Sequence, residues 1–194
     1  MRHIFSPVGA WRFVLFVVIT LFVLWICDQN VPFAGHKRIE YTFGELNGVI
    51  SQLRPLSRAS TIGEANAPKG VQIVFEDPVY FDIKTPVSYE NVVFTVAYQN
   101  HSNRKLGIGM KMGEGWNFLV KPFNETRTED FQESRIAFDL RNVPRVNGKY
   151  TFLFSIPGLT LQGREKEFVT FSHMSVELER PPLITMIKRV LAAY

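Results

Sequence analysis

The chain has 194 residues, of which 46% are hydrophobic and 13% aromatic, and its formal net charge is +4. This length is enough for one well-buried domain and hardly for two. The positive charges occur in small pairs rather than in a basic block with interleaved aromatic residues, which argues against a nucleic-acid partner. The single cysteine, Cys27, excludes a disulfide within the chain.

An apolar run covers residues 13–27 and is interrupted only by Thr20. Counted back to Val8 it gives twenty residues, which as a helix span about 30 Å, the thickness of a bilayer's hydrocarbon core. Trp11 and Trp25 lie near its two ends, where amphipathic rings favour the headgroup level. We therefore expect a transmembrane anchor with its core over residues 13–27 and the lipid bilayer as its partner.

The charges around this run predict its orientation. Arg2 and Arg12 precede it and Asp28 follows it, so residues 1–12 are expected to form a cytoplasmic tail and the rest of the chain to be extracytoplasmic. Arg12 lies one turn from the end of the span and can reach the interface. A cleaved signal peptide is the alternative, but no obvious cleavage site follows the run. The expected protein is therefore a single-pass protein of the cell membrane.

Residues 28–70 are expected to form a juxtamembrane linker with one short helix. The stretch 42–45, Thr-Phe-Gly-Glu, has the capping-box pattern of a helix start. A helix over about 43–53 follows, and Pro55 ends it because proline disfavours helical geometry in the residue before it. The apolar residues that share one face of this helix are Leu46, Val49, Ile50 and Leu53.

After residue 70 the pattern changes to short alternating segments separated by turn signals, of which Asn147-Gly148 is the strongest. About eight such segments, spaced near ten residues apart without long helices between them, are typical of an antiparallel β-sandwich or barrel. We expect this domain over residues 71–180, with 91–98 as a central strand that is apolar on both faces. The predicted strands are 71–75, 79–84, 91–98, 106–112, 116–121, 136–140, 150–156 and 167–179.

The C-terminal stretch 181–194 begins with two prolines and continues with apolar residues at helical spacing. A helix of about twelve residues is too short to span a bilayer. It either packs on the sandwich or on the 43–53 helix, or lies on the membrane or against a partner as an amphipathic element. The residues expected at such a membrane or partner contact are Leu183, Met186, Ile187, Lys188, Arg189 and Val190.

Three segments carry a resemblance to a known family: RIAFDL at 135–140, KYTFLFSIPGL at 149–159 and MSVEL at 174–178. They resemble the closing strands of galactose-binding-like jelly-roll β-sandwiches, which include many carbohydrate-binding modules. The segment DPVYFD at 77–82 and the strands after it are also similar to membrane-anchored β-sandwich proteins of the bacterial envelope. The resemblance covers about residues 71–180. It implies an antiparallel jelly-roll fold and glycan binding as a candidate function; the fold by itself does not assign the function.

Catalytic and metal-binding patterns are absent from the sequence. The four histidines are far apart and none has metal-ligand spacing. Adjacent carboxylates such as Glu76 and Asp77 lie in predicted loops, where solvated acids are the rule. We therefore expect no enzymatic activity, no cofactor and no metal. A calcium ion held by loop carboxylates, which is common in related jelly rolls, is the alternative that the resemblance leaves open.

Trp116 is the candidate ligand-binding residue. It follows the glycine-containing turn 113–115, where a large ring can be presented for stacking on a sugar. Asn117, Asp82 and Arg135 are the candidates for hydrogen bonds to such a ligand. The alternative is that Trp116 plugs one end of the sandwich.

Two functions follow from these observations. The first is a non-enzymatic, membrane-anchored envelope protein whose extracytoplasmic sandwich mediates protein–protein interaction or scaffolding. The second is a surface carbohydrate-binding module that uses Trp116 and nearby polar residues. The sequence favours the first, because no polar constellation converges on Trp116 along the chain.

Overall fold

The structure is a computed structural model. It describes the chain except for residues 1–6, 31–34, 61–69, 125–129, 164–166, 183–184 and 186–194, and in the first helix it describes the side chains of residues 11–26. The chain divides into two compact units. One unit is His36–Arg180, and the other comprises Met1–Gly35 with Pro181–Tyr194.

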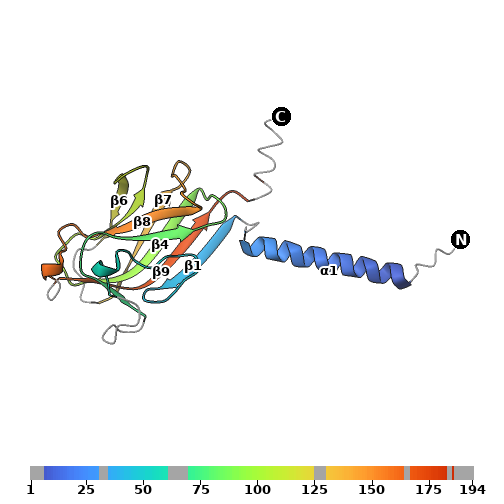
Figure 1. Cartoon of the computed structure of the whole chain (residues 1–194), viewed down its shortest axis with the longest axis horizontal. Coiled ribbons are helices and arrows are strands. Elements are labelled where there is room, and N and C mark those ends of the chain that lie inside the picture. Colours follow the sequence, from blue (N-terminus) through green and yellow to red (C-terminus); the bar gives the residue numbers. More distant parts are fainter. Residues whose placement is uncertain are drawn as a thin grey trace. The chain divides into compact units, whose positions relative to one another are not determined.

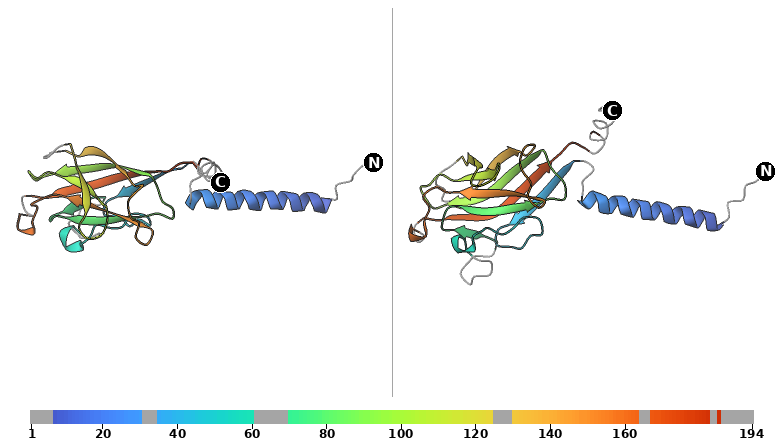
Figure 2. Two further views of the ribbon diagram at one scale, coloured as in Figure 1. Left: turned by 90° about the horizontal axis from the view of Figure 1, so that it is seen from above. Right: turned by 45° about the horizontal axis from the view of Figure 1, so that its top comes forward.

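The unit His36–Arg180 consists of two antiparallel sheets (Figure 1 and Figure 2). The five-stranded sheet has the order β1 (His36–Thr42), β9 (Val169–Glu179), β4 (Asn91–Asn100) and β7 (Gln132–Asp139), with β2 (Gln72–Val74) also pairing with β9. The four-stranded sheet has the order β3 (Val79–Lys84), β8 (Lys149–Ser155), β5 (Gly107–Lys111) and β6 (Phe118–Pro122). Two short 3-10 helices, η1 (Leu56–Arg58) and η2 (Leu161–Gly163), lie in the connections.

Phenylalanine rings from both sheets meet in the core. Phe152 of β8 and Phe94 of β4 have their ring centroids 4.8 Å apart in an edge-to-face arrangement. Phe154 of β8 and Phe171 of β9 are stacked at 4.3 Å. All four side chains are fully buried. Aromatic pairs of this kind contribute about 0.5–1.5 kcal/mol beyond the burial of their area, so they help to hold the two sheets together.

The expectation of a mainly β, antiparallel fold is confirmed, and each of the eight predicted strands overlaps an observed one. Strand β4 differs in detail, because its buried and partly exposed residues alternate and only one of its faces lies in the core. The ninth strand, β1, occupies a segment that we assigned to the linker. Ile39 and Tyr41 of β1 alternate into the core.

The predicted helix over 43–53 is wrong. A helix face would bury its four apolar residues together, but Ile50 and Leu53 are buried whereas Leu46 is 81% exposed. Asn47 is responsible for part of the local geometry, because its Oδ1 accepts hydrogen bonds from the N–H groups of Val49 (2.8 Å) and Ile50 (3.0 Å). The segment then runs extended and pairs with β3 through bridges at Ile50 and Arg54.

The other unit contains the helix α1 (Pro7–Asn30). The large apolar side chains described between Trp11 and Ile26 are all exposed, on every side of the helix. Within the described residues, which include the side chains of α1 only from Trp11 to Ile26, no helix is both long enough and apolar enough to cross a bilayer. The predicted transmembrane anchor therefore stays a prediction. The predicted C-terminal helix lies outside the described residues except for Thr185, which is helical.

Tyr41 is expected to make the stability of the fold depend on pH. Its side chain is buried, its hydroxyl has no hydrogen-bond partner among the described residues, and burial raises its pKa to about 12. Above about pH 10 the unfolded chain loses a proton that the folded chain keeps, so stability should fall as the pH rises from about 10 to 12. Burial also raises the pKa of Tyr80 and Tyr89, so we expect Tyr41→Phe to reduce this fall rather than to abolish it. The substitution should also raise stability at neutral pH by up to about 1 kcal/mol.

Urea denaturation between pH 7 and 11 measures both effects. Tyr150→Phe is the matched control, because the Tyr150 hydroxyl accepts a hydrogen bond from the Tyr89 N–H (3.3 Å), and its loss should cost about 1 kcal/mol. An unchanged pH dependence in Tyr41→Phe would contradict the assignment.

Candidate functional site

The outer face of the four-stranded sheet is determined by the alternation of β3. Val79, Phe81 and Ile83 are fully buried, so Tyr80, Asp82 and Lys84 point away from the core. Their partners on β8 share this face because residues opposite each other in a ladder lie on the same side of the sheet. The outer face comprises Tyr80, Asp82 and Lys84 of β3, Lys149, Thr151 and Leu153 of β8, Gly107, Gly109 and Lys111 of β5, and Phe118 and Val120 of β6.

The extended segment after Asn47 adds residues along the edge of β3. The N–H of Arg54 donates to the Tyr80 carbonyl (2.8 Å), and the N–H of Tyr80 donates to the Arg54 carbonyl (2.7 Å). The N–H of Ser51 donates to the Asp82 carbonyl (2.9 Å), and Ser51 Oγ accepts from the Asp82 N–H (2.8 Å). This pairing holds Arg54 beside the outer face.

Asp82 is the centre of a polar network on this face. Arg54 Nη2 donates to its Oδ2 at 2.6 Å, and Thr151 Oγ1 donates to its Oδ1 at 2.8 Å. Asp82 is buried, whereas the Arg54 side chain is 53% exposed. The carboxylate is therefore held in place, and the guanidinium keeps donors that face solvent. A groove of about 700 Å³ lies over this network and is lined by Arg54, Pro55, Leu56, Tyr80, Asp82 and Thr151.

Tyr80, which lines the groove, contacts two further aromatic side chains, Trp116 and Phe118. Trp116 is 75% exposed, and its ring lies 5.6 Å from Tyr80 and 6.4 Å from Phe118, centroid to centroid. Gly115, at φ +65°, forms the turn that presents Trp116. The Met112 N–H closes this hairpin by donating to the Asn117 carbonyl (2.8 Å).

The aromatic residues meet across the sheet. Strands β3 and β6 are its two edges and lie three strand spacings, about 14 Å, apart, yet the rings of Tyr80 and Phe118 are 6.1 Å apart. Gly109 makes this approach possible, because a Cβ at this position would lie 2.9 Å from Leu153 Cδ1. Leu153 is only 4% exposed although it is on the outer face, so it forms an apolar floor beneath the rings.

The structure brings together two of the four predicted ligand-binding residues. Trp116 contacts Tyr80, and Tyr80 lines the groove together with Asp82. Asn117 is exposed and adjoins Trp116 in the same hairpin. Arg135 does not belong to this site: it lies on β7 of the other sheet and pairs with Glu177 at 3.3 Å. The exposure of Trp116 also overturns the alternative in which this ring plugs the sandwich.

Four residues of this site were not predicted from the sequence: Tyr80, Phe118, Arg54 and Thr151. The alternation of 79–84 did carry a signal for Tyr80, because it assigns this residue to the same face as Asp82. Arg54 carried no such signal, since residues 43–53 were expected to be helical. In the described part of the chain, no three His, Cys, Asp or Glu side chains gather as potential ligands of a metal ion.

No protein-family model matches the sequence, and no curated protein is significantly similar to it. Solved structures with a similar fold include the CBM22-1 xylan-binding domain from Paenibacillus barcinonensis, with 9% identity, a TM-score of 0.47 and coverage of 73% of this chain and 94% of the domain. A family 35 carbohydrate-binding module from Cellvibrio japonicus has 13% identity, a TM-score of 0.44 and coverage of 74% and 98%. The expected β-sandwich is shown by the two antiparallel sheets of this structure, and its similarity to these carbohydrate-binding modules does not transfer a ligand.

The Arg54–Asp82 pair yields a prediction about stability. Asp82→Asn removes the charge that Arg54 Nη2 contacts while the amide oxygen still accepts from Thr151. Because Asp82 is buried, we expect a loss of about 1–2 kcal/mol in urea denaturation. Asp139→Asn is the control, since Asp139 pairs with Arg141 at an exposed position, and its unfolding midpoint should not change. Equal midpoints for both variants would contradict a structural role of the buried pair.

Proposed function

We propose that this chain is a carbohydrate-binding protein without enzymatic activity, and that it binds glycans on the outer face of the four-stranded sheet. The observation that carries the proposal is the exposed ring of Trp116 beside Phe118 and Tyr80, the latter lining a groove that also holds a fixed charged pair. An aromatic residue exposed to this extent, in contact with other aromatic rings, is typical of a binding surface.

The chemistry of the groove fits a sugar. A sugar ring has an apolar face of C–H groups, which packs on an aromatic ring, and an edge of hydroxyls, which need both donors and acceptors. Trp116 supplies the flat apolar surface, Arg54 supplies exposed donors, and Thr151 supplies a hydroxyl. A mostly apolar groove with a few fixed polar groups is the usual form of a small-molecule site.

We further propose that α1 holds the protein at a cell membrane, with the β-sandwich on the extracytoplasmic side. The exposed apolar side chains from Trp11 to Ile26 support this attachment, because apolar surface in water costs about 25 cal/mol per Å² and lipid would cover it on all sides. The basic residues Arg2 and Arg12 before the apolar run and Asp28 after it support the orientation.

The glycan proposal predicts a selective effect of Trp116→Ala. A glycan array screened with the full-length chain, followed by isothermal titration with the best ligand, should show saturable binding that Trp116→Ala weakens at least tenfold. The free energy of unfolding of the Trp116→Ala variant should differ from that of the wild type by no more than about 0.5 kcal/mol, because the Trp116 ring is mostly exposed. Phe131→Ala is the matched control, since Phe131 is exposed (46%) but precedes β7 of the other sheet. Binding that survives Trp116→Ala would refute this site.

The membrane proposal predicts how the chain fractionates. The full-length protein should remain with membranes after an alkaline carbonate wash. Val18→Arg/Leu21→Arg places two charges in the middle of the apolar run, each costing about 3 kcal/mol in a bilayer, and should release the protein. Leu46→Arg, at an exposed position outside α1, should not. Recovery of the wild-type chain in the aqueous fraction would contradict the attachment.

One observation favours the second candidate function, a protein-interaction or scaffolding subunit. Strand β6 is a free edge of its sheet, and its side chains Leu119 (46%) and Val120 (45%) are exposed. Exposed apolar edge strands are sites of strand addition by partner proteins. A stoichiometric partner that is lost on Leu119→Lys or on deletion of residues 183–194, while no glycan binds, would favour this function over the first.

A further inference from the structure

Two lysines stand opposite each other at one end of the outer face. Lys84 of β3 and Lys149 of β8 are directly paired in the ladder, and both side chains are exposed. Like charges at directly opposed positions of a sheet are destabilising. This arrangement therefore carries an energetic cost in the unliganded protein.

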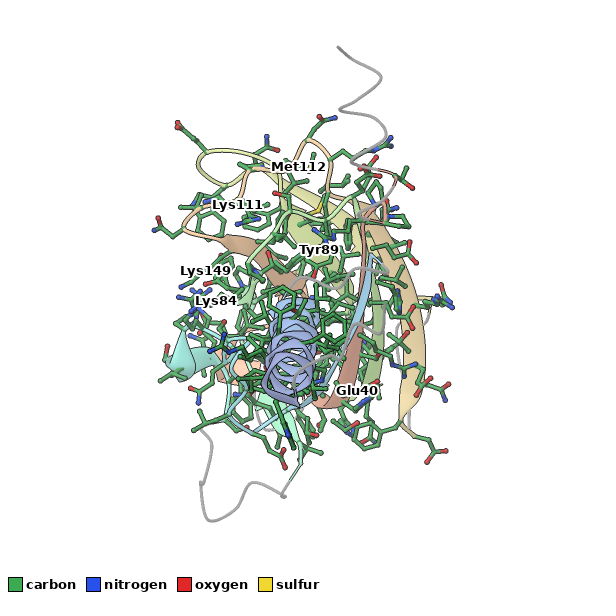
Figure 3. All side chains as sticks on the ribbon, turned by 90° about the vertical axis from the view of Figure 1, so that its right-hand side faces the viewer. Glu40, Lys84, Tyr89, Lys111, Met112 and Lys149 are labelled. Atoms are coloured by element: carbon green, nitrogen blue, oxygen red, sulfur yellow. The ribbon has the colours of Figure 1, made fainter. Side chains whose placement is uncertain are left out.

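Carboxylates do not neutralise these lysines. Among the described residues, none of the ion pairs includes Lys84 or Lys149. The nearest acid on this face, Asp82, already accepts from Arg54 and Thr151 with its two carboxylate oxygens. Lys111 lies on the same side of the molecule in Figure 3, and Glu40 lies on the opposite side. The outer face of the four-stranded sheet therefore has excess positive charge.

The two lysines line a hollow that adjoins the groove. Its volume is about 170 Å³, and its other lining residues are Asn47, Gly48, Val49, Ile50, Ser51 and Asp82. Asp82 lines both the hollow and the groove. Lys84 lies four residues beyond Tyr80 on β3, which is about 13 Å along the strand. A ligand that reaches both the aromatic residues and the lysines must therefore be longer than one sugar ring.

We propose that the glycan bound on this face is an acidic oligosaccharide or polysaccharide, with a sugar carboxylate between Lys84 and Lys149 and another sugar of the same chain stacked on Trp116. This inference rests on the proposed function and specifies its ligand class. A carboxylate satisfies both ammonium groups at once and removes the repulsion between them. The attraction acts at an exposed site, so it weakens as the salt concentration rises.

The test uses two forms of one polymer: glucuronoxylan, and the same polymer after chemical reduction of its carboxyl groups to alcohols. Full-length protein is kept in a polyoxyethylene detergent, because the sugar headgroups of glycoside detergents would compete for the site. We expect the acidic form to bind roughly tenfold more tightly than the reduced form at low salt. This preference should disappear in 0.5 M NaCl.

Lys84→Gln/Lys149→Gln should abolish the preference for the acidic polymer over the reduced polymer. Affinity for the reduced polymer should not change, and the unfolding midpoint should stay the same or rise. Lys37→Gln/Lys105→Gln is the control with the same change of net charge, at lysines that line neither the groove nor the hollow, and it should keep the preference. Equal binding of both polymers by the wild type would overturn this inference and leave the proposed function standing.

If the wild type bound neither polymer and no glycan on an array, the proposed function itself would be refuted. Lysine-dependent binding to anionic phospholipid vesicles without binding to the acidic polymer would also overturn the inference, in favour of a lipid headgroup.

Discussion

The packing of phenylalanine rings between the two sheets is the constraint on which the rest of this protein depends. Phe81, Phe152 and Phe154 are fully buried and contact rings of the five-stranded sheet. Side chains alternate along a strand, so burying these residues decides which residues of β3 and β8 face outward. A one-residue slip of β3 would move Asp82 into the core and Phe81 to the surface. The core thus determines the composition of the outer face.

The outer face differs from an ordinary solvated sheet surface. Gly109 and the buried side chain of Leu153 allow rings from both edges of the sheet to approach each other. The segment after Asn47 brings an arginine to the same face and fixes a buried carboxylate beside the rings. An apolar platform, a fixed charged pair and two lysines that form no ion pair with any described residue therefore lie along one surface. This combination supports recognition of a ligand with apolar faces, hydroxyl edges and negative charge.

The strands were predictable because their signal is local. A period of two over 79–84 or 150–156 is visible in a short window, and each such segment became a strand. The 43–53 segment was not predictable in this way, because its helical spacing competes with an Asn47 turn and with pairing to β3, which is distant in sequence. Its burial pattern, with Leu46 exposed and Ile50 buried, is decided by that tertiary pairing.

The candidate site was predictable only in part for the same reason. Trp116 was predicted as a site residue because it follows a glycine-containing turn. Asp82 was also predicted, and it lies on the outer face together with Tyr80, which Trp116 contacts. Arg54 is 28 positions away from Asp82 in the sequence, and nothing in the local pattern joins them. Arg135 was grouped with Trp116 although strand order places it on the other sheet. Local periodicity assigns a residue to one face of its own strand, whereas the identity of the neighbouring strands follows from the complete topology.

The central claim is that the exposed ring of Trp116 is a ligand-stacking surface, and fluorescence of that ring tests it most directly. The chain has three tryptophans, so Trp11→Phe/Trp25→Phe leaves Trp116 as the sole tryptophan emitter. Titration of this variant with soluble glucuronoxylan oligosaccharides should give a saturable blue shift of the emission and protection from acrylamide quenching. Emission and quenching that remain those of a solvent-exposed indole at saturating oligosaccharide, with the fold intact, would contradict the account.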